Sequence, residues 1–393
     1  MAKKPTPAGD AGFRAELPAG VLAAAAARAA VVVPSRTTMP IAENALLRGT
    51  GGRLTVAATN LDQGLSVTVE AEAEGAVTVP AAKLSAIASR LDANAPVALT
   101  MGTGAMALTI AQGRSSFRLP VMQASDWPEA MVSPLDGAAD AWTVDAGIFS
   151  RHLKALESGA STDEVRYYIC GIFLDLDRAD PRMVVTDGYK FGLIHLADLA
   201  PPRRKGLTLP TSALRPIHDI AKGADTLAIG LSDTAVTVEA RGIRLRTKLI
   251  DASFPDYERA VPLAERPVML TVEADRFSTA IRRAMLVAPD SLTEAEKKAK
   301  KVSFTSVCLA IGDGEIQVSS RNRMGEEAAD VCPCELTAGE GLEIHLNASH
   351  LAWGIDSLGG DTIDIACGEA VEPILIRRHG DTADLRVIAP QRR

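Results

Sequence analysis

Aromatic residues and long apolar runs are both scarce in this 393-residue chain, and each scarcity excludes a class of protein. Phe, Trp and Tyr make up only 4% of the residues, and they form no cluster that would mark a sheet for stacking single-stranded bases. A transmembrane helix needs roughly 18 to 20 uninterrupted apolar residues. The alanine-rich run near the N-terminus is shorter and is broken by Arg28. We therefore expect a protein without membrane spans.

Cysteine is also rare and has no pattern typical of a cofactor site. The five cysteines are an odd number, and none has a partner at the spacing of a zinc site or a redox motif. Cys332 and Cys334 could form half of a metal site, but they lie in a β-like segment without a second half. We expect reduced thiols, no metal, no cofactor and a cytoplasmic protein.

A pattern of strand, turn and amphipathic helix occurs three times. ELPAGVLAAAAARAA, TVDAGIFSRHLKALE and TVEADRFSTAIRRAM share this plan, and their alanines Ala19, Ala146 and Ala274 lie 127 and 128 residues apart. A second block, an alternating strand that ends in Pro or Asn before a helix, follows in each copy as VTVPAAKLSAIASRL, LTLPTSALRPIHDIA and IHLNASHLAWGIDSL. Self-similarity at a fixed spacing is typical of repeated structural units.

These patterns predict an α+β protein built from three similar units. The expected helices cover 18–33, 146–160 and 274–287 in the first block, and 81–91, 211–222 and 348–358 in the second. Pro216 should shorten or kink the helix at 211–222. Alternating strand pairs with polar turns fill the sequence between and after the helices. Each unit should have two helices and two small antiparallel sheets, and the expected divisions are a mobile tail over 1–11 and domains over 12–138, 139–265 and 266–393.

Positive charge is concentrated in the predicted helices. They hold ten Lys and Arg against four acids, a net +6, which leaves −13 for the rest of a chain whose total is −7. Basic residues that only solubilise exposed helices would give the same count. If the three units present their helices to one side, however, these residues form one surface that would hold DNA through its phosphates, without base readout. The helical residues expected to face DNA are Lys83, Arg90, Arg151, Lys154, Arg215, Lys222, Arg276, Arg282 and Arg283.

Four further segments carry a family resemblance. They are DEVRYYICGIF (163–173), VVTDGYKFGL (184–193), KLIDASFPDY (248–257) and the strand–proline–helix pattern at 77 and 207. With them, the chain resembles the bacterial replicative sliding clamp, the β subunit of DNA polymerase III, from about residue 12 to 393. The resemblance implies the DNA clamp fold and a head-to-tail homodimeric ring of six similar domains, with helices inside around duplex DNA and sheets outside.

The resemblance also implies a function and partners. A ring that encircles duplex DNA without reading its sequence can slide, and by tethering the polymerase it makes replication processive. The implied partners are duplex DNA, a second copy of the chain, the α subunit of DNA polymerase III, a clamp loader and other proteins with a clamp-binding motif. The chain has no P-loop of its own, so the ATP that opens the ring would be used by the loader.

A peptide-binding cleft between the second and third domains is the main site that the resemblance implies. One side of it would contain Ile169, Thr186, Gly188, Tyr189, Lys190, Phe191, Pro255, Arg259, Ala260 and Val387. The neighbouring subsite would contain Arg166, Tyr168, Val371, Pro373, Pro390, Gln391 and Arg392. Residues 166–168 are expected to open an apolar strand, in which Tyr168 walls the groove, Ile169 forms its floor, and Tyr167 points toward the core or the DNA side.

Further positions follow from the same resemblance. The ring interface would use Phe117 on one edge and Leu286 with Val287 on the other, and Arg36 and the loop around Thr162 and Asp163 would meet DNA. Two features depart from the family pattern. The chain ends APQRR where an apolar tail is common in the family, which predicts a shallower or more polar cleft. The Lys-rich segment 291–301 is longer than the usual loop at this place, and it is either a solvated excursion or a DNA-facing patch.

We find no catalytic constellation in the sequence. GTGAMA at 102–107 fits a loose dinucleotide fingerprint, but a strand follows it where a helix is required. The aspartates in the turns at 187, 251 and 256 have no His or second carboxylate placed with them for acid–base chemistry. The sequence therefore predicts a sliding clamp that is not an enzyme. The alternative is a diverged clamp paralogue or a peptide-binding adaptor that does not serve the main replicase.

Overall fold

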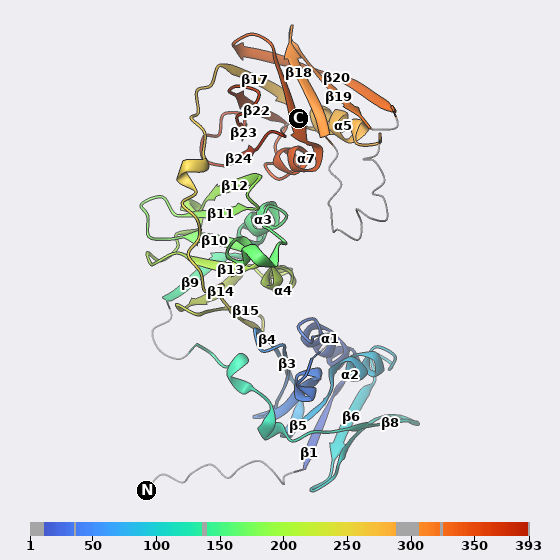
Figure 1. Cartoon of the computed structure of the whole chain (residues 1–393). Helices are drawn as coiled ribbons and strands as arrows, with labels where there is room; N and C mark the ends of the chain where they lie inside the picture. Colours follow the sequence, from blue (N-terminus) through green and yellow to red (C-terminus); the bar gives the residue numbers. More distant parts are fainter. Residues whose placement is uncertain (1–11, 35–36, 136–139, 288–305, 323–324, 392–393) are drawn as a thin grey trace. The chain divides into compact units, whose positions relative to one another are not determined.

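The computed structural model describes residues 12–34, 37–135, 140–287, 306–322 and 325–391 (Figure 1). The chain divides into two compact units, Met1–Ser150 with Ser212–Leu249, and Arg151–Thr211 with Ile250–Arg393. Each unit contains one 12-stranded sheet whose neighbouring strands are antiparallel. The mixture of long antiparallel sheets with a few short helices is the α+β class that the sequence predicts.

One order of elements occurs three times along the chain: a strand, a helix, four strands, a helix and three strands. The first repeat consists of β1 (Phe13–Pro18), α1 (Ala19–Ala30), β2 (Asn44–Thr50), β3 (Arg53–Thr59), β4 (Gln63–Glu70), β5 (Glu72–Pro80), α2 (Ala81–Ala88), β6 (Pro96–Met101), β7 (Ala107–Gln112) and β8 (Ser115–Pro120). The second consists of β9 (Asp140–Asp145), α3 (Ala146–Glu157), β10 (Gly171–Asp175), β11 (Arg182–Thr186), β12 (Lys190–His195), β13 (Leu207–Pro210), α4 (Leu214–Ala221), β14 (Thr226–Leu231), β15 (Ala235–Ala240) and β16 (Ile243–Lys248). The third consists of β17 (Val268–Glu273), α5 (Ala274–Ala284), β18 (Ser306–Gly312), β19 (Glu315–Arg321), β20 (Glu327–Ala338), β21 (Leu342–Asn347), α7 (Ala348–Asp356), β22 (Thr362–Cys367), β23 (Ile374–Arg378) and β24 (Leu385–Ile388).

The three alanines that revealed the repeat have the same structural role. Each is the first residue of its helix, and its N–H donates a hydrogen bond to a carbonyl oxygen just before the sixth strand of its repeat. Ala19 donates to Ala95 (3.0 Å), Ala146 to Asp225 (3.0 Å) and Ala274 to Asp361 (2.8 Å). The first N–H groups of a helix have no partner inside the helix. A close backbone contact satisfies one of them here, and all three alanine side chains are buried, where a larger side chain would not fit without movement.

The six predicted helices are present, each shorter at its C-terminal end than the sequence suggested. α1 shows why an alanine-rich segment is helical: alanine has the highest helix propensity, and Leu22, Ala25, Ala26 and Ala29 recur at helical spacing on the buried face. α4 begins at Leu214 rather than at residue 211, after a short 3-10 turn. This start position accommodates Pro216, because a proline within the first turn removes an N–H that would be unpaired anyway.

Strand pairing joins neighbouring repeats in the same way at two places. β4, the fourth strand of the first repeat, pairs with β16, the last strand of the second, and Leu65 lies opposite Leu245. β12 pairs with β24 between the second and third repeats, and Leu193 lies opposite Leu385. The third repeat has its own fourth strand, β20. Among the described residues, the part of β20 over 327–333 pairs with β19 alone. β8, the last strand of the first repeat, lies at the end of its sheet and, within the described chain, pairs only with β7.

The helices cover one face of the sheets within each unit. In the first unit α1 contacts α2 and packs on β3 and β4, and in the second unit α5 contacts α7 and packs on β19 and β20 (Figure 1). Phe277 and Ile281 of α5, together with Leu351 and Ile355 of α7, are buried in a core shared with these strands. The opposite faces of the sheets carry the alternate, more polar residues, as antiparallel sheets with one solvated face do.

Candidate functional site

The turn between β11 and β12 is held in one conformation by its own side chains. Asp187 Oδ1 accepts hydrogen bonds from the N–H groups of Tyr189 (2.8 Å) and Lys190 (2.9 Å), and the Thr186 hydroxyl donates to the carbonyl oxygen of Lys190 (2.8 Å). Gly188 has a φ of +92°, a conformation that favours glycine. The rigid turn leaves the Tyr189 side chain 62% exposed at its tip.

A short 3-10 helix, η4 (Glu164–Ile169), lies against this turn through Arg166. Arg166 Nη1 donates to the carbonyl oxygen of Asp187 (2.9 Å), and its Nε donates to Asp163 Oδ2 (3.0 Å). The hydrogen bond with Asp163 raises the pKa of Arg166 and lowers that of the Asp163 carboxyl. Arg166 therefore keeps its charge and connects η4 to the turn.

The prediction of a strand at 166–168 was wrong. The residues form η4, and β10 begins only at Gly171. A 3-10 helix does not alternate its side chains between two faces, and Tyr167 is 54% exposed, so the expectation that it points toward the core is wrong. The other expectation, that it points toward the DNA side, stays a prediction. Tyr168 is half-buried and lies edge-on to Tyr167, with ring centroids 6.1 Å apart.

A buried polar cluster lies beneath the turn. The Asp187 side chain is only 17% exposed, and its Oδ2 lies 3.7 Å from Lys190 Nζ and 3.8 Å from His350 Nε2 of α7. Lys190 Nζ also lies over the Trp353 ring, 5.2 Å from its centroid. Burial lowers the pKa of both Lys190 and His350. The cluster ties the turn to α7 through the contacts of Asp187 and Lys190 with His350 and Trp353.

Arg386 fixes α7 from the other side. Its side chain is fully buried and donates to the Ser357 hydroxyl (2.8 Å) and to the carbonyl oxygens of Leu193 (3.1 Å) and Leu385 (2.9 Å). The guanidinium lies 5.6 Å from the Trp353 ring centroid, and burial lowers its pKa to about 10. The end of α7 is thereby joined to β12 and β24, the two strands that meet at the repeat junction.

The C-terminal segment after β24 runs between the turn and β21. The Ala389 N–H donates to the carbonyl oxygen of Tyr189 (2.8 Å), and the Gln391 N–H donates to that of His345 (2.8 Å). Pro390 forms an isolated bridge with Leu346. Pro390 and Gln391 therefore lie beside the turn that carries Tyr189 and Lys190, whereas Arg392 lies outside the described residues.

The residues expected in the peptide cleft differ in exposure. Ile169, Phe191 and Val387 are only 3 to 4% exposed, and Phe191 stacks on Tyr257 in a core cluster with a 5.8 Å centroid distance. These three side chains are therefore buried and do not themselves form the accessible surface of the expected cleft. The members that are at least partly accessible are Arg166, Tyr168, Thr186, Gly188, Tyr189, Lys190, Pro255, Arg259, Ala260, Val371, Pro373, Pro390 and Gln391.

Sequence reasoning missed the groups that hold this surface in place. His350, Trp353 and Arg386 contact the turn or one another, yet in the sequence they read as ordinary helix and strand residues. Tyr257 was also missed: its hydroxyl donates to Asp175 Oδ2 (2.6 Å), and burial raises its pKa. The only available signal was the placement of His350 and Trp353 about one turn apart on a helix that is otherwise mostly apolar.

The basic residues expected to face DNA are all exposed where the structure describes them. They are Lys83, Arg90, Arg151, Lys154, Arg215, Lys222, Arg276, Arg282 and Arg283, while Arg36 and the segment 291–301 lie outside the described residues. Three have carboxylate neighbours: Lys154 with Glu157 (2.5 Å), Arg282 with Asp356 (2.5 Å) and Arg283 with Asp330 (2.9 Å). Exposed pairs of this kind stabilise by only about 0 to 1 kcal/mol, so the basic groups can exchange a carboxylate for a phosphate at small cost.

The residues expected at the ring interface are accessible in the single chain. Phe117 on β8 is 36% exposed and Leu286 after α5 is 81% exposed, while Val287 is half-buried. Residues at the position of Phe117 in the other repeats, Leu245 and Leu385, are buried at a strand junction. Phe117 therefore presents an apolar side chain at a strand position that the other two repeats cover.

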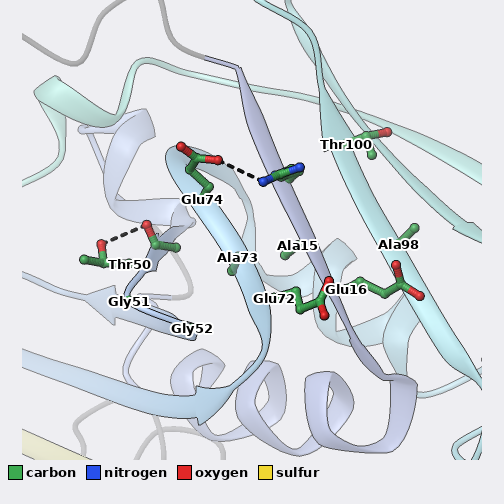
Figure 2. Close-up of a pocket in the computed structure, with 12 residues that line it drawn as sticks. Ala15, Glu16, Thr50, Gly51, Gly52, Glu72, Ala73, Glu74, Ala98 and Thr100 are labelled. Atoms are coloured by element: carbon green, nitrogen blue, oxygen red, sulfur yellow. Dashed lines mark hydrogen bonds and ion pairs between the residues drawn. The ribbon is translucent and has the colours of Figure 1, made fainter.

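A hollow of about 730 Å³ on the first repeat lies apart from all of these positions (Figure 2). Figure 2 shows residues of β1, β5, β6 and the β2–β3 turn around it. Arg14 Nη2 and Glu74 Oε2 form an ion pair there (3.2 Å). Glu16 lies opposite Glu72 on the neighbouring strand. The lining contains the carboxylates of Glu16, Glu72 and Glu74 and no histidine or cysteine.

One carboxylate and one imidazole form a close pair in the third repeat. Asp364 Oδ1 contacts His379 Nδ1 (2.8 Å) and accepts a hydrogen bond from the Thr271 hydroxyl (2.7 Å). The contact with Asp364 raises the pKa of His379. In a nucleophile–base–acid relay the imidazole must lie between the hydroxyl and the carboxylate. Here the carboxylate lies in the middle, so the imidazole cannot take the proton of Thr271.

The chain is similar to known proteins over most of its length. Two family models match the chain, the N-terminal domain of the DNA polymerase III beta subunit over residues 19–131 and its central domain over residues 143–256. The beta sliding clamp of Caulobacter vibrioides is 29% identical over 372 residues, covering 92% of this chain and 95% of that protein. The beta sliding clamp of Synechococcus elongatus is 26% identical over 367 residues, covering 91% and 93%.

Solved structures are similar over nearly the whole chain. The crystal structure of the C. crescentus beta sliding clamp superposes with a TM-score of 0.88 at 27% identity, covering 98% of this chain and 100% of that one. A DNA polymerase III subunit beta from Bartonella birtlesii, bound to griselimycin, gives a TM-score of 0.87 at 26% identity, covering 97% and 100%. None of the helices that the structure describes is long and apolar enough to cross a membrane. The two family models together match more than half of the residues, and this chain belongs to the DNA polymerase III beta subunit family.

Proposed function

We propose that this protein is a DNA sliding clamp, a ring of two chains that encircles duplex DNA and tethers the replicative polymerase for processive synthesis. The observation that carries the proposal is the repeated strand junction. β4 pairs with β16 and β12 pairs with β24, in each case the fourth strand of one repeat with the last strand of the next. β20 and β8 are the corresponding strands that lack this partner within the described chain.

The two unmatched strands support a head-to-tail dimer. If β20 of one chain pairs with β8 of a second chain, and the reverse, the series of six repeats closes on itself without leaving either edge exposed. Closure of this kind avoids the open sheet edges that otherwise promote aggregation. Phe117, at the position where Leu245 and Leu385 are buried, would then be covered by the partner chain, near Leu286 and Val287.

The chemistry of the helices supports a channel for duplex DNA. Their basic residues are exposed, and the exposed ion pairs of Arg282 and Arg283 leave them available to phosphate. Contacts to phosphates alone carry no sequence information, so the ring could move along the duplex. The three repeats would correspond to three clamp domains with divisions near residues 138 and 265.

We place the binding site for partner peptides at the surface formed by η4, the Gly188 turn and the C-terminal segment. Tyr168, Tyr189 and Val371 supply exposed or half-exposed apolar groups, and Arg166 and Lys190 supply fixed donors. A short linear peptide needs this combination of apolar contacts and a few orienting donors. The expected ligands are the polymerase α subunit, the clamp loader and other proteins with clamp-binding motifs, and the chain itself supplies no catalysis.

Retention on circular DNA tests the proposal. After loading by a bacterial clamp loader onto nicked circular DNA, the protein should stay bound through gel filtration and should be lost when the circle is cut once. Failure to remain on circles, or equal retention on circles and on linear DNA, would refute encirclement. A diverged paralogue that no longer serves the replicase would still pass this test, but it would not increase the product length of the replicative polymerase. The family comparisons favour the replicative role over that alternative.

A further inference from the structure

Three possible metal ligands lie side by side on the solvent face of the third repeat. Cys308 belongs to β18, and Glu343 and His345 belong to the neighbouring strand β21. Cys308 lies directly opposite His345, and Glu343 lies two residues before His345. Side chains two residues apart on a strand point to the same face. Val307, Leu309 and Leu346, which alternate with them, are buried in the core.

The distances suit coordination of one ion. The sulfur of Cys308, a carboxylate oxygen of Glu343 and a ring nitrogen of His345 all lie within 4.8 Å of one another. His345 Nε2 is 3.4 Å from Glu343 Oε1. Two nitrogen or oxygen ligands at about 2.0–2.1 Å from a tetrahedral zinc ion are separated by about 3.3 Å. The His–Glu pair is already at this separation, and the sulfur needs only a small side-chain movement to complete the set.

His345 also has an unsatisfied polar atom. Its Nε2 is buried, yet it has no hydrogen-bond partner of acceptable geometry among the described residues. Buried polar atoms are normally hydrogen-bonded, and one that is not calls for a physical reason. A metal ion between His345, Glu343 and Cys308 would supply the missing interaction, because a neutral imidazole nitrogen is a good ligand.

We propose that Cys308, Glu343 and His345 bind a single Zn²⁺ ion. Thiolate, imidazole and carboxylate together are the ligand types of zinc, whereas Mg²⁺ and Ca²⁺ prefer oxygen ligands alone. Three protein ligands leave a fourth position for water. A hollow of about 710 Å³, also lined by Ser319 and Arg321, gives solvent access to that position.

Zinc at this position would cross-link two strands next to the candidate peptide site. β21 continues directly into α7, which carries His350 and Trp353, and the carbonyl oxygen of His345 accepts the N–H of Gln391. The ion would therefore restrain both the start of α7 and the C-terminal segment. The proposal does not depend on the sliding-clamp function, because it rests on the ligand geometry of one sheet.

Zinc titration of the full-length protein tests the site. In reducing buffer we expect one Zn²⁺ per chain by calorimetry, with proton release because the thiol must ionise. Co²⁺ should give a thiolate-to-cobalt charge-transfer band. Cys308→Ser should abolish the band. Cys308→Ser and His345→Asn should each weaken affinity by more than about 100-fold, since loss of a supporting group alone costs 10- to 100-fold. Glu343→Gln should also weaken binding.

Cys170→Ser is the matched control, since Cys170 is half-buried like Cys308 but belongs to the second repeat; this variant should keep the band and the affinity. Circular dichroism of each variant shows whether it is folded. If wild-type protein binds no Zn²⁺ at micromolar concentrations, or if folded Cys308→Ser binds as tightly as wild type, the site does not exist. Should Cys308→Ser not fold, wild-type affinity in folded Glu343→Gln and His345→Asn would equally overturn the proposal.

Discussion

Replacing Gly188 by alanine should destabilise the turn at the candidate peptide site through two separable effects. Gly188 has a φ of +92°, which an L-residue adopts at a cost of about 1–2 kcal/mol. A Cβ atom here would also lie 2.7 Å from Arg166 Nη1, closer than van der Waals contact allows. Arg166 can swing away, but it then loses its hydrogen bond to the carbonyl oxygen of Asp187, and a bond from a charged group contributes about 1.5–3 kcal/mol. The expected total is about 2.5–5 kcal/mol.

Two comparison variants separate these effects. Gly380 also has a positive φ (+75°), but a Cβ there meets nothing within 4 Å, so Gly380→Ala should cost only the backbone strain. In an Arg166→Ala background, Gly188→Ala should likewise cost only about 1–2 kcal/mol. Urea unfolding followed by tryptophan fluorescence measures the free energies. An equal cost of Gly188→Ala with and without Arg166 would refute the proposed contact. Affinity for a clamp-binding peptide should fall in Gly188→Ala, because both Arg166 and Tyr189 change position.

Further predictions concern the DNA surface, the peptide site and the ring interface. Replacing Arg282 and Arg283 by Glu should weaken retention on DNA and flatten its salt dependence; an unchanged slope would count against α5 facing DNA. Tyr168→Ala combined with deletion of the last five residues should abolish peptide binding by calorimetry, and unaltered affinity would contradict the site. Wild-type protein should have a solution mass near twice 41.3 kDa, while Phe117→Asp or Leu286→Asp should be monomeric with unchanged circular dichroism. A dimeric Phe117→Asp would contradict pairing through β8.

The repeated architecture could be predicted from sequence because it depends on local signals. Alanine at the start of each first helix is required by a close backbone contact, and this contact occurs at the same place in every repeat. Alternating residues predicted the strand pairs β3–β4, β11–β12 and β19–β20, which the structure confirms. The pairing of β4 with β16 and of β12 with β24 joins residues far apart in the sequence, and no local pattern indicates it.

The conformation of residues 164–169 shows where alternation misleads. Apolar and aromatic residues in Val165–Ile169 resemble a strand, but Asp163 accepts a hydrogen bond from the Val165 N–H and starts a 3-10 helix instead. Local hydrogen bonds from an aspartate compete with strand formation. The same limitation hid the proposed zinc ligands, because Cys308 and His345 meet only through the pairing of β18 with β21.

The turn before the junction strand, β4 in the first repeat and β12 in the second, shows which part of the candidate site is common to the repeats and which part is not. In the first repeat, Thr59 and Asn60 make the same side-chain hydrogen bonds to the backbone as Thr186 and Asp187 make in the second. Both turns contain a residue with positive φ, Leu61 in the first and Gly188 in the second. The backbone geometry of the turn is therefore common to the first two repeats and does not by itself mark the candidate site.

The residue that follows this common turn differs between the two repeats. Gln63 follows the first turn and donates to the Ser212 hydroxyl (2.8 Å), a neutral contact. Lys190 follows the second turn and shares Asp187 with His350, which creates a polar cluster at the turn that carries the exposed Tyr189. The Asp187 carboxylate lies within 4 Å of both Lys190 Nζ and His350 Nε2, and these contacts join the turn to α7. The first two repeats thus share the turn, and a few different side chains on it form the candidate site in the second. The repeated fold could therefore be predicted from the sequence pattern, whereas the cluster of Asp187, Lys190 and His350 is visible only in the folded structure.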